Sequence, residues 1–143
     1  MFYGKHIHAL DSKSRVFVPS KFREELGSSF IITKGLDTCL FAFTMAEWAN
    51  VEQRMKNISF TDNEGRSFMR FLFAGAAECE VDKQGRILIP QDLKEYANLD
   101  KEICIVGLSN RIEIWDKNLW DKQNSEGDRN AAMLAKRMAI LGI

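Results

Sequence analysis

Two short segments of the chain place an aspartate four residues before an arginine, from Asp11 to Arg15 and from Asp82 to Arg86. A guanidinium group offers a planar fork of donors that matches phosphate oxygens and the edge of guanine, so an exposed arginine suits nucleic-acid binding. The aspartate can hold that arginine, or accept backbone N–H groups and so organise a tight loop. A structural salt bridge between the two residues is the alternative interpretation.

Both segments belong to an internal repeat, which is the most informative feature of the sequence. Residues 4–22 match residues 75–93 at a constant offset of 71, with Gly, Asp, Arg and Pro at the same positions. After a slip of one residue the match resumes at an offset of 72, where Gly35 and Trp48 align with Gly107 and Trp120. Copies of about 45 residues bury too little surface to be stable alone. We therefore expect them to pack together across an approximate two-fold axis.

The residue pattern predicts the same elements in both copies. A strand leads into each Asp-x-x-x-Arg segment and a β-branched strand follows it. Pro19 and Pro90 are expected to stop that strand and to occupy the first position of a short helix. Gly35 and Gly107 are expected to supply turns between later strands. The expected short helices cover residues 20–26 and 91–97, and the later strands cover residues 30–33, 39–43, 103–106 and 111–115.

Longer helices are predicted outside the strands. Thr44 and Asp116 are suitable N-caps for two of them. A linker helix is expected over residues 64–73 and a last helix over residues 128–141, because apolar side chains recur there at helical spacing. The predicted organisation is a first module at residues 1–50, linker helices at 51–74, a second module at 75–123 and a C-terminal helix at 124–143.

The composition is typical of a globular protein, with 45% apolar and 28% charged residues. The sequence has no apolar stretch of the roughly 18 residues that a membrane span needs, and no charged leader followed by an apolar run, which predicts a cytoplasmic protein. The net charge is zero, but residues 1–34 carry six Lys and Arg against three Asp and Glu, whereas residues 35–82 carry four against eight. This distribution fits one nucleic-acid face and a separate assembly face.

Cysteines and histidines favour neither catalysis nor a metal site. Cys39, Cys79 and Cys104 lie far apart in apolar runs, which is typical of buried thiols in a reducing compartment. His6 and His8 would share one face of a strand, but no carboxylate or thiol follows at useful spacing, and the second copy has Ala77 and Cys79 at the equivalent positions. The sequence contains no catalytic motif and no phosphate-binding loop, and so predicts no enzyme, no cofactor and no metal.

The sequence resembles the MraZ family over nearly the whole chain. The resemblance rests on the opening residues 1–4, the two Asp-x-x-x-Arg segments, the run 73–90 and the run 107–116. It implies a β-rich α+β fold, in which two tandem AbrB/SpoVT-like swapped-hairpin modules form one pseudo-two-fold, β-barrel-like core with flanking helices. It also implies a nucleoid-associated, ring-shaped homo-oligomer. Such a protein would regulate the bacterial division and cell-wall gene cluster by binding direct repeats in promoter DNA.

The resemblance also implies which residues contact DNA. Arg15 and Arg86 become the leading contacts, with Lys13 and Lys83 beside them in the loops. Further basic residues flank the first loop, and for this reason we expect the first copy to dominate affinity. These residues are Lys5, Lys21 and Arg23.

Three residues are expected to organise the loops: Asp11, Asp82 and Gly85. The family usually has glycine directly before the arginine, as in Gly85, but the first copy has Ser14 there. If that position needs a positive φ, serine adopts it only at a cost in free energy. The geometry of the first loop is therefore the less certain of the two.

A protein from another class remains the alternative, namely an assembly protein that uses the same fold only for oligomerisation. Salt dependence separates the two, because phosphate contacts release counterions and so weaken steeply as salt rises. In either case self-association needs apolar surface. We expect that surface on the helices around Trp48, Phe68, Phe71 and Trp120.

Overall fold

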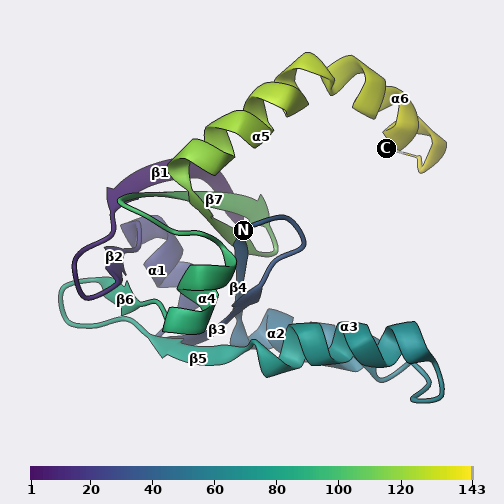
Figure 1. The fold of residues 1–143 in the computed structure, drawn as a ribbon, viewed down its shortest axis with the longest axis horizontal. Coiled ribbons are helices and arrows are strands. Elements are labelled where there is room, and N and C mark those ends of the chain that lie inside the picture. Colours follow the sequence, from purple (N-terminus) through teal and green to yellow (C-terminus); the bar gives the residue numbers. More distant parts are fainter. Residues whose placement is uncertain (143) are drawn as a thin grey trace.

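The computed structural model describes residues 1–142, and Figure 1 shows a mixed α+β fold with strands at its centre. The strands are β1 (Phe2–Ala9), β2 (Arg15–Phe17), β3 (Ser29–Lys34), β4 (Leu40–Thr44), β5 (Ala77–Glu80), β6 (Arg86–Leu88), β7 (Glu102–Ser109) and β8 (Ile112–Asp116). The helices are α1 (Ser20–Leu26), α2 (Met45–Met55), α3 (Asn63–Ala74), α4 (Gln91–Tyr96), α5 (Lys117–Arg129) and α6 (Ala131–Ile140). The elements β1 to α3 recur in the same order as β5 to α6, which confirms the repeat.

Six strands form one antiparallel sheet in the order β1-β7-β8-β4-β3-β5. This order reads the same from either edge once the strands of one copy are exchanged for those of the other, so the sheet has the expected pseudo-two-fold symmetry. β1 pairs with β7, from Phe2 opposite Ser109 to Ala9 opposite Glu102. β5 pairs with β3 in the same way. The copies therefore exchange their first strands, and neither completes a sheet alone.

The strands β2 and β6 form a separate, antiparallel two-stranded ribbon. At its centre Val16 lies opposite Ile87, and both side chains are buried. The resemblance implied a barrel-like core, but residues 1–142 form a six-stranded sheet and this ribbon rather than a closed barrel. The reason is that the chain leaves the sheet after β1 and after β5, so β2 and β6 pair with each other and not with the sheet edges.

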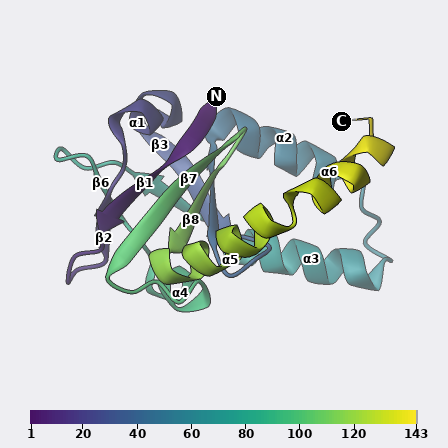
Figure 2. The ribbon, with the colours of Figure 1, turned by 90° about the horizontal axis from the view of Figure 1, so that it is seen from above.

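The main core lies between one face of the sheet and a layer made of the ribbon, α1 and α4. Side chains from all these elements meet in it, including Phe22, Phe30, Ile87, Leu93 and Ile114. The helices α2 and α3 pack against the sheet over β3 and β4, and α5 packs over β7 and β8. Figures 1 and 2 show the ribbon at one end of the molecule and the long helices reaching away from the other.

The two long helical arms, α2–α3 and α5–α6, pack differently. α3 folds back beside α2, where Leu72 packs with Ile31 and Trp48, and Thr33 Oγ1 donates a hydrogen bond to the carbonyl of Leu72 at 2.6 Å. α6 instead lies at the far end of α5, apart from the sheet (Figure 1), and none of its side chains is buried. The C-terminal arm therefore departs from the symmetry of the strands. No helix within residues 1–142 is long and apolar enough to cross a membrane.

Both predicted N-caps are confirmed. Thr44 Oγ1 accepts a hydrogen bond from the N–H of Glu47 at 3.1 Å, and Asp116 Oδ2 accepts one from the N–H of Leu119 at 3.3 Å. The helix that Asp116 caps runs on to Arg129, beyond residue 124, where we placed the start of the C-terminal helix. The four-part division of the chain remains a proposal.

Two local predictions were wrong. Pro19 and Pro90 are the N-caps of α1 and α4 rather than their first residues, because a ψ of 140° and 145° keeps each proline extended. Gly107 does not form a turn but lies inside β7, opposite Gly4. A side chain at Gly107 would collide with the backbone of β1. The glycine therefore permits the close approach of the exchanged strand.

Candidate nucleic-acid interface

The first Asp-x-x-x-Arg segment forms a tight loop between β1 and β2. The N–H of Asp11 donates to the carbonyl of Arg15 at 2.9 Å, and the N–H of Ser14 donates to the carbonyl of Asp11 at 3.0 Å. Asp11 Oδ1 accepts the backbone N–H groups of Lys13 and Arg15, both at 2.9 Å. Asp11 Oδ2 accepts Nε of Arg15 at 2.8 Å. One carboxylate thus holds both the loop backbone and the arginine side chain.

The second loop, between β5 and β6, repeats this set of hydrogen bonds. The N–H of Asp82 donates to the carbonyl of Arg86 at 2.8 Å, and the N–H of Gly85 donates to the carbonyl of Asp82 at 3.0 Å. Asp82 Oδ1 accepts the N–H groups of Gln84 and Arg86, and Asp82 Oδ2 accepts Nε of Arg86, all at 2.9 Å. The two loops therefore share one geometry.

The residue before each arginine has a positive φ. The angle is 84° at Gly85 and 62° at Ser14. Glycine adopts this region freely, whereas a residue with a Cβ pays roughly 1–2 kcal/mol there. The serine of the first copy thus keeps the shape of the loop and lowers its stability.

Each aspartate binds its arginine through only one nitrogen of the guanidinium group. Because each carboxylate accepts from Nε, those bonds leave the terminal Nη1 and Nη2 nitrogens unused. Arg86 Nη1 lies 3.9 Å from Asp11 Oδ2, so the second arginine reaches toward the first loop. The side chains of Arg15 and Arg86 remain 32% and 20% exposed. Each arginine is therefore fixed in direction and still has free donor atoms at the surface.

Backbone hydrogen bonds join each loop to the end of the opposite strand of the ribbon. The N–H of Val18 donates to the carbonyl of Gly85 at 3.0 Å, and the N–H of Ile89 donates to the carbonyl of Ser14 at 2.8 Å. The loops consequently lie at the two ends of the β2–β6 ribbon. Figure 1 shows both at the end of the molecule opposite the arms α2–α3 and α5–α6. The structure thus brings the repeated segments together on one surface.

Both aspartates are stabilised as anions. Hydrogen bonds from the backbone N–H groups of Arg15 and Arg86 hold the pKa of Asp11 and of Asp82 below the ordinary range, and the guanidinium groups lower the pKa further. Each Asp–Arg pair is consequently neutral overall at neutral pH. Attraction to an anionic partner must therefore come from the other basic residues nearby.

The predicted basic residues are distributed unequally. Lys13 and Lys83 are both exposed, but Lys13 occupies the third position of its loop and Lys83 the second. Lys5 on β1 and Lys21 on α1 are also exposed. Lys5 stands six residues before Asp11, whereas Lys21 follows Val18, whose N–H donates to the carbonyl of Gly85 in the second loop. The equivalents of Lys5 and Lys21 in the repeat are Ala76 and Asp92.

Arg23 was expected to flank the first loop, but the structure places it elsewhere. It is half-buried beneath the second loop, and a Cβ added at Gly85 would collide with its Nη1. Its Nε is buried and has no hydrogen-bond partner among residues 1–142. Gly85 thus needs both a positive φ and space for a guanidinium. The sequence did not reveal this contact, because Arg23 belongs to the first copy and Gly85 to the second.

The two histidines pack against phenylalanine rings. His6 lies edge-on to Phe22 at 5.3 Å between ring centroids, and His8 lies 6.3 Å from Phe17. Burial and the neighbouring His6 lower the pKa of His8. Within residues 1–142, no group of three or more His, Cys, Asp or Glu side chains is arranged to hold a metal ion.

All three cysteines are buried and reduced. Burial raises the pKa of Cys39 to about 12, and that of Cys79 and Cys104 to about 11. Because the thiolate is the reactive form of cysteine, thiols with such pKa values are poor nucleophiles at neutral pH. Their burial agrees with the interpretation as small core residues.

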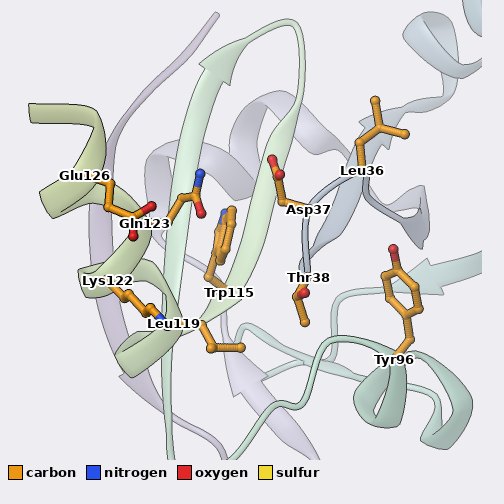
Figure 3. Close-up of a pocket in the computed structure, with 9 residues that line it drawn as sticks. All are labelled: Leu36, Asp37, Thr38, Tyr96, Trp115, Leu119, Lys122, Gln123 and Glu126. Atoms are coloured by element: carbon orange, nitrogen blue, oxygen red, sulfur yellow. The ribbon is translucent and has the colours of Figure 1, made fainter. Parts of the chain in front are cut away.

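A pocket of about 440 Å³ lies between α5, α4 and the turn that joins β3 to β4 (Figure 3). Trp115 and Tyr96 line it together with charged residues such as Asp37 and Glu126. None of its lining residues belongs to either Asp-x-x-x-Arg loop. The pocket is therefore separate from the surface that carries the arginines.

Comparison with known proteins agrees with the architecture. The family model described as "MraZ protein, putative antitoxin-like" matches the chain twice, over residues 1–71 and 72–141. A protein of Acetivibrio thermocellus is 55% identical over 143 residues, and one of Caldicellulosiruptor saccharolyticus is 52% identical over 143 residues; each alignment covers 100% of both chains. A protein of Desulforamulus reducens is 53% identical over 141 residues, which cover 99% of both chains.

Each of these relatives is named transcriptional regulator MraZ. The name denotes a regulator of transcription and not an enzyme. The double match of the family model coincides with the repeat and with the strand exchange seen in the sheet. The chain belongs to the MraZ family.

Proposed function

We propose that the protein is a sequence-specific DNA-binding transcriptional regulator that contacts double-stranded DNA through its two Asp-x-x-x-Arg loops. The observation that carries the proposal is the pair of loops with one geometry on one surface, each with an arginine held through Nε. An arginine fixed in this way has its terminal nitrogens free to bind guanine or a phosphate. The names of the relatives support the same function.

The flanking lysines supply the affinity in this proposal. Lys13 and Lys83 are exposed in the loops, and Lys5 and Lys21 are exposed on β1 and α1. In this proposal they neutralise phosphates and release counterions. Arg23 contributes mainly by supporting the second loop from below. Asp11, Asp82 and Gly85 set the shape of the loops, and neutral Asp–Arg pairs favour directed contacts over general attraction to phosphate.

The target we propose is a set of direct repeats in the promoter of the division and cell-wall gene cluster, with the protein acting at the nucleoid in the cytoplasm. One chain offers two loops, which make few phosphate contacts. A ring-shaped homo-oligomer would multiply these contacts along one duplex. Repeats spaced near one helical turn, about 10 base pairs, would then meet successive loops on the same face of the DNA.

For such an assembly we propose the apolar surface of α6 in place of the surface around Trp48, while Phe68, Phe71 and Trp120 are partly exposed. Trp48 is buried against Phe43 and Phe73, at 5.7 and 5.5 Å between ring centroids. On α6, Leu134 and Met138 are 46% and 39% exposed. Helix α6 is thus the element we propose for self-association.

A mobility-shift assay on DNA upstream of the protein's own gene tests the DNA-binding proposal. The double variant Arg15→Ala/Arg86→Ala should lose specific binding while its melting temperature stays near that of the unchanged protein. Arg70→Ala, which removes an exposed arginine from α3, is the matched control and should bind normally. Steep weakening with salt is expected. Binding by the double variant that equals the control would leave only the structural role of the Asp–Arg pairs.

Light scattering tests the assembly proposal. The unchanged protein should have the mass of a homo-oligomer, and Leu134→Ser/Met138→Ser should reduce that mass without lowering the helix content. A monomer at micromolar concentration that binds one repeat as tightly as several would show that multivalency is not the mechanism.

A further inference from the structure

The β2–β6 ribbon has one face that the core does not use. Its strands pair with Arg15 opposite Leu88, Val16 opposite Ile87 and Phe17 opposite Arg86. Residues that are directly opposite in an antiparallel pair project from the same face, and neighbours along a strand project from opposite faces. Val16 and Ile87, each 1% exposed, point into the core. The outer face therefore consists of two arginines and two apolar side chains.

The two apolar side chains of this outer face are exposed. Phe17 is 47% exposed and Leu88 is 60% exposed. They occupy equivalent positions of the repeat, so the pseudo-two-fold axis relates them to each other just as it relates the two arginines. Phe17 leans on His8, with 6.3 Å between the ring centroids. Neither side chain belongs to a buried cluster of the core.

A ribbon with this pattern matches the major groove of DNA. The groove is wide enough for a two-stranded ribbon, where arginine donates to guanine and an apolar side chain packs against the 5-methyl group of thymine. An arginine on each strand faces an apolar residue on the other, so both kinds of contact are held at fixed spacing. Exposed apolar residues at such positions gain free energy only if a partner covers them.

We propose that Phe17 and Leu88 are specificity-determining residues that recognise thymine methyl groups beside the bases contacted by Arg15 and Arg86. This inference rests on the proposed function and adds to it the chemistry of the bases that are read. The target site then contains thymines at a fixed distance from the guanines, once for each half of the ribbon. The Phe17 half makes the larger contact, since its ring is supported by His8.

Replacing thymine by deoxyuridine tests the proposal, because it removes the methyl group and nothing else. Duplexes of random sequence are first enriched by binding to the unchanged protein, and each thymine of the enriched site is then replaced in turn. Loss of one buried methyl contact should weaken binding about fourfold. The variant Phe17→Ser/Leu88→Ser should bind the original site more weakly and should no longer respond to deoxyuridine. Leu36→Ser, at a position 67% exposed on the β3–β4 turn, is the matched control.

The outcomes separate this inference from the function on which it rests. Deoxyuridine sensitivity at defined positions in the unchanged protein and in Leu36→Ser, but not in Phe17→Ser/Leu88→Ser, supports the proposal. If every thymine can be replaced without loss while Arg15→Ala still weakens binding, the apolar contacts are refuted and the DNA-binding function stands. If no sequence is enriched from the random pool, both are refuted. Circular dichroism of the variants confirms folding, which substitutions at exposed positions should leave intact.

Discussion

The two copies of the repeat carry the same loop in opposite electrostatic surroundings. The strand β1, which leads into the first loop, has Lys5 and the uncharged Ile7 and Ala9. Beside the second loop, the positions of β5 that correspond to Ile7 and Ala9 hold the exposed carboxylates Glu78 and Glu80. The hydrogen bonds within the loops are nevertheless the same in kind and length.

This difference shows that the shape of each loop and the charge around it are determined by different residues. Shape comes from the aspartate and from the positive φ before the arginine. Charge comes from the flanking strand and helix. In the proposed function, the first copy would contribute more to affinity and the second copy would add directed contacts. Substitutions can therefore change the shape of the loops and the charge around them separately.

The largest effect is expected from single removal of the arginines. Arg15→Ala and Arg86→Ala should each weaken specific binding by about ten- to a hundredfold, since a bidentate base contact provides about 1–3 kcal/mol of discrimination. The loss should be greater for Arg15, because the basic flank holds the first loop closer to the DNA. Titration of the enriched duplex measures both. A greater loss for Arg86→Ala would contradict the assignment of affinity to the first copy.

The next effect concerns the stability of the second loop. Gly85→Ala should lower the free energy of unfolding by at least about 1–2 kcal/mol, because alanine must adopt the positive φ and its Cβ meets the guanidinium of Arg23. Adding Arg23→Ala removes the collision and should recover part of the loss. Chemical denaturation measures all three variants. No recovery in the double variant would mean that backbone strain alone explains the effect.

A smaller effect is expected from neutralising the aspartates. Asp11→Asn/Asp82→Asn should lower the unfolding midpoint at neutral pH, because both carboxylates have a pKa held below the ordinary value of about 4. A lowered pKa contributes stability above the unfolded-state value, and that contribution disappears as the pH falls through the folded-state value. The two proteins should therefore converge in strongly acidic solution. Midpoints that stay equally far apart at every pH would exclude the charge as the cause.

Changing the acidic flank should strengthen binding modestly. Glu78→Gln/Glu80→Gln removes two negative charges beside the second loop and should raise affinity severalfold at low salt, with a smaller gain at high salt because of screening. Glu126→Gln on α5 is a control that lies outside both loops. A gain that does not diminish with salt would point to a change in structure rather than in charge.

The smallest effect is expected from making the first loop like the second. Ser14→Gly removes the strain of a positive φ but adds freedom to the unfolded chain, so a net gain below about 1 kcal/mol is expected. Thermal unfolding measures it. A loss of stability would mean that the serine side chain contributes contacts that outweigh its strain.

Local features of the molecule could be predicted well from the sequence. The helix at residues 20–26, the N-caps Thr44 and Asp116 and the twin loops follow from short-range rules of capping and turn formation, and all are found in the structure. These features depend on residues within a few positions of one another. The internal repeat also predicted the pseudo-two-fold symmetry, because similar sequences favour similar structures.

Long-range features could not be predicted in the same way. The pairing of β1 with β7, the position of Gly107 inside a strand and the contact of Arg23 with Gly85 all join distant parts of the chain. A pattern of alternating residues shows which side chains are buried but not which strand lies beside them. Strand alternation indicates that Phe17 and Leu88 are exposed, but only the pairing of β2 with β6 places them on one face with Arg15 and Arg86.

The exchange of β1 has a consequence for how the protein is made. Phe2 pairs with Ser109, so the first strand leaves the ribosome long before its partner has been synthesised. Pairings between residues so far apart in sequence also slow folding, because the chain loses the entropy of a long loop before it gains any contact. Until the second repeat has emerged, the first is a nascent segment with unpaired strand edges that is vulnerable to aggregation. Completion of the second half during translation is thus the event that permits the first half to fold.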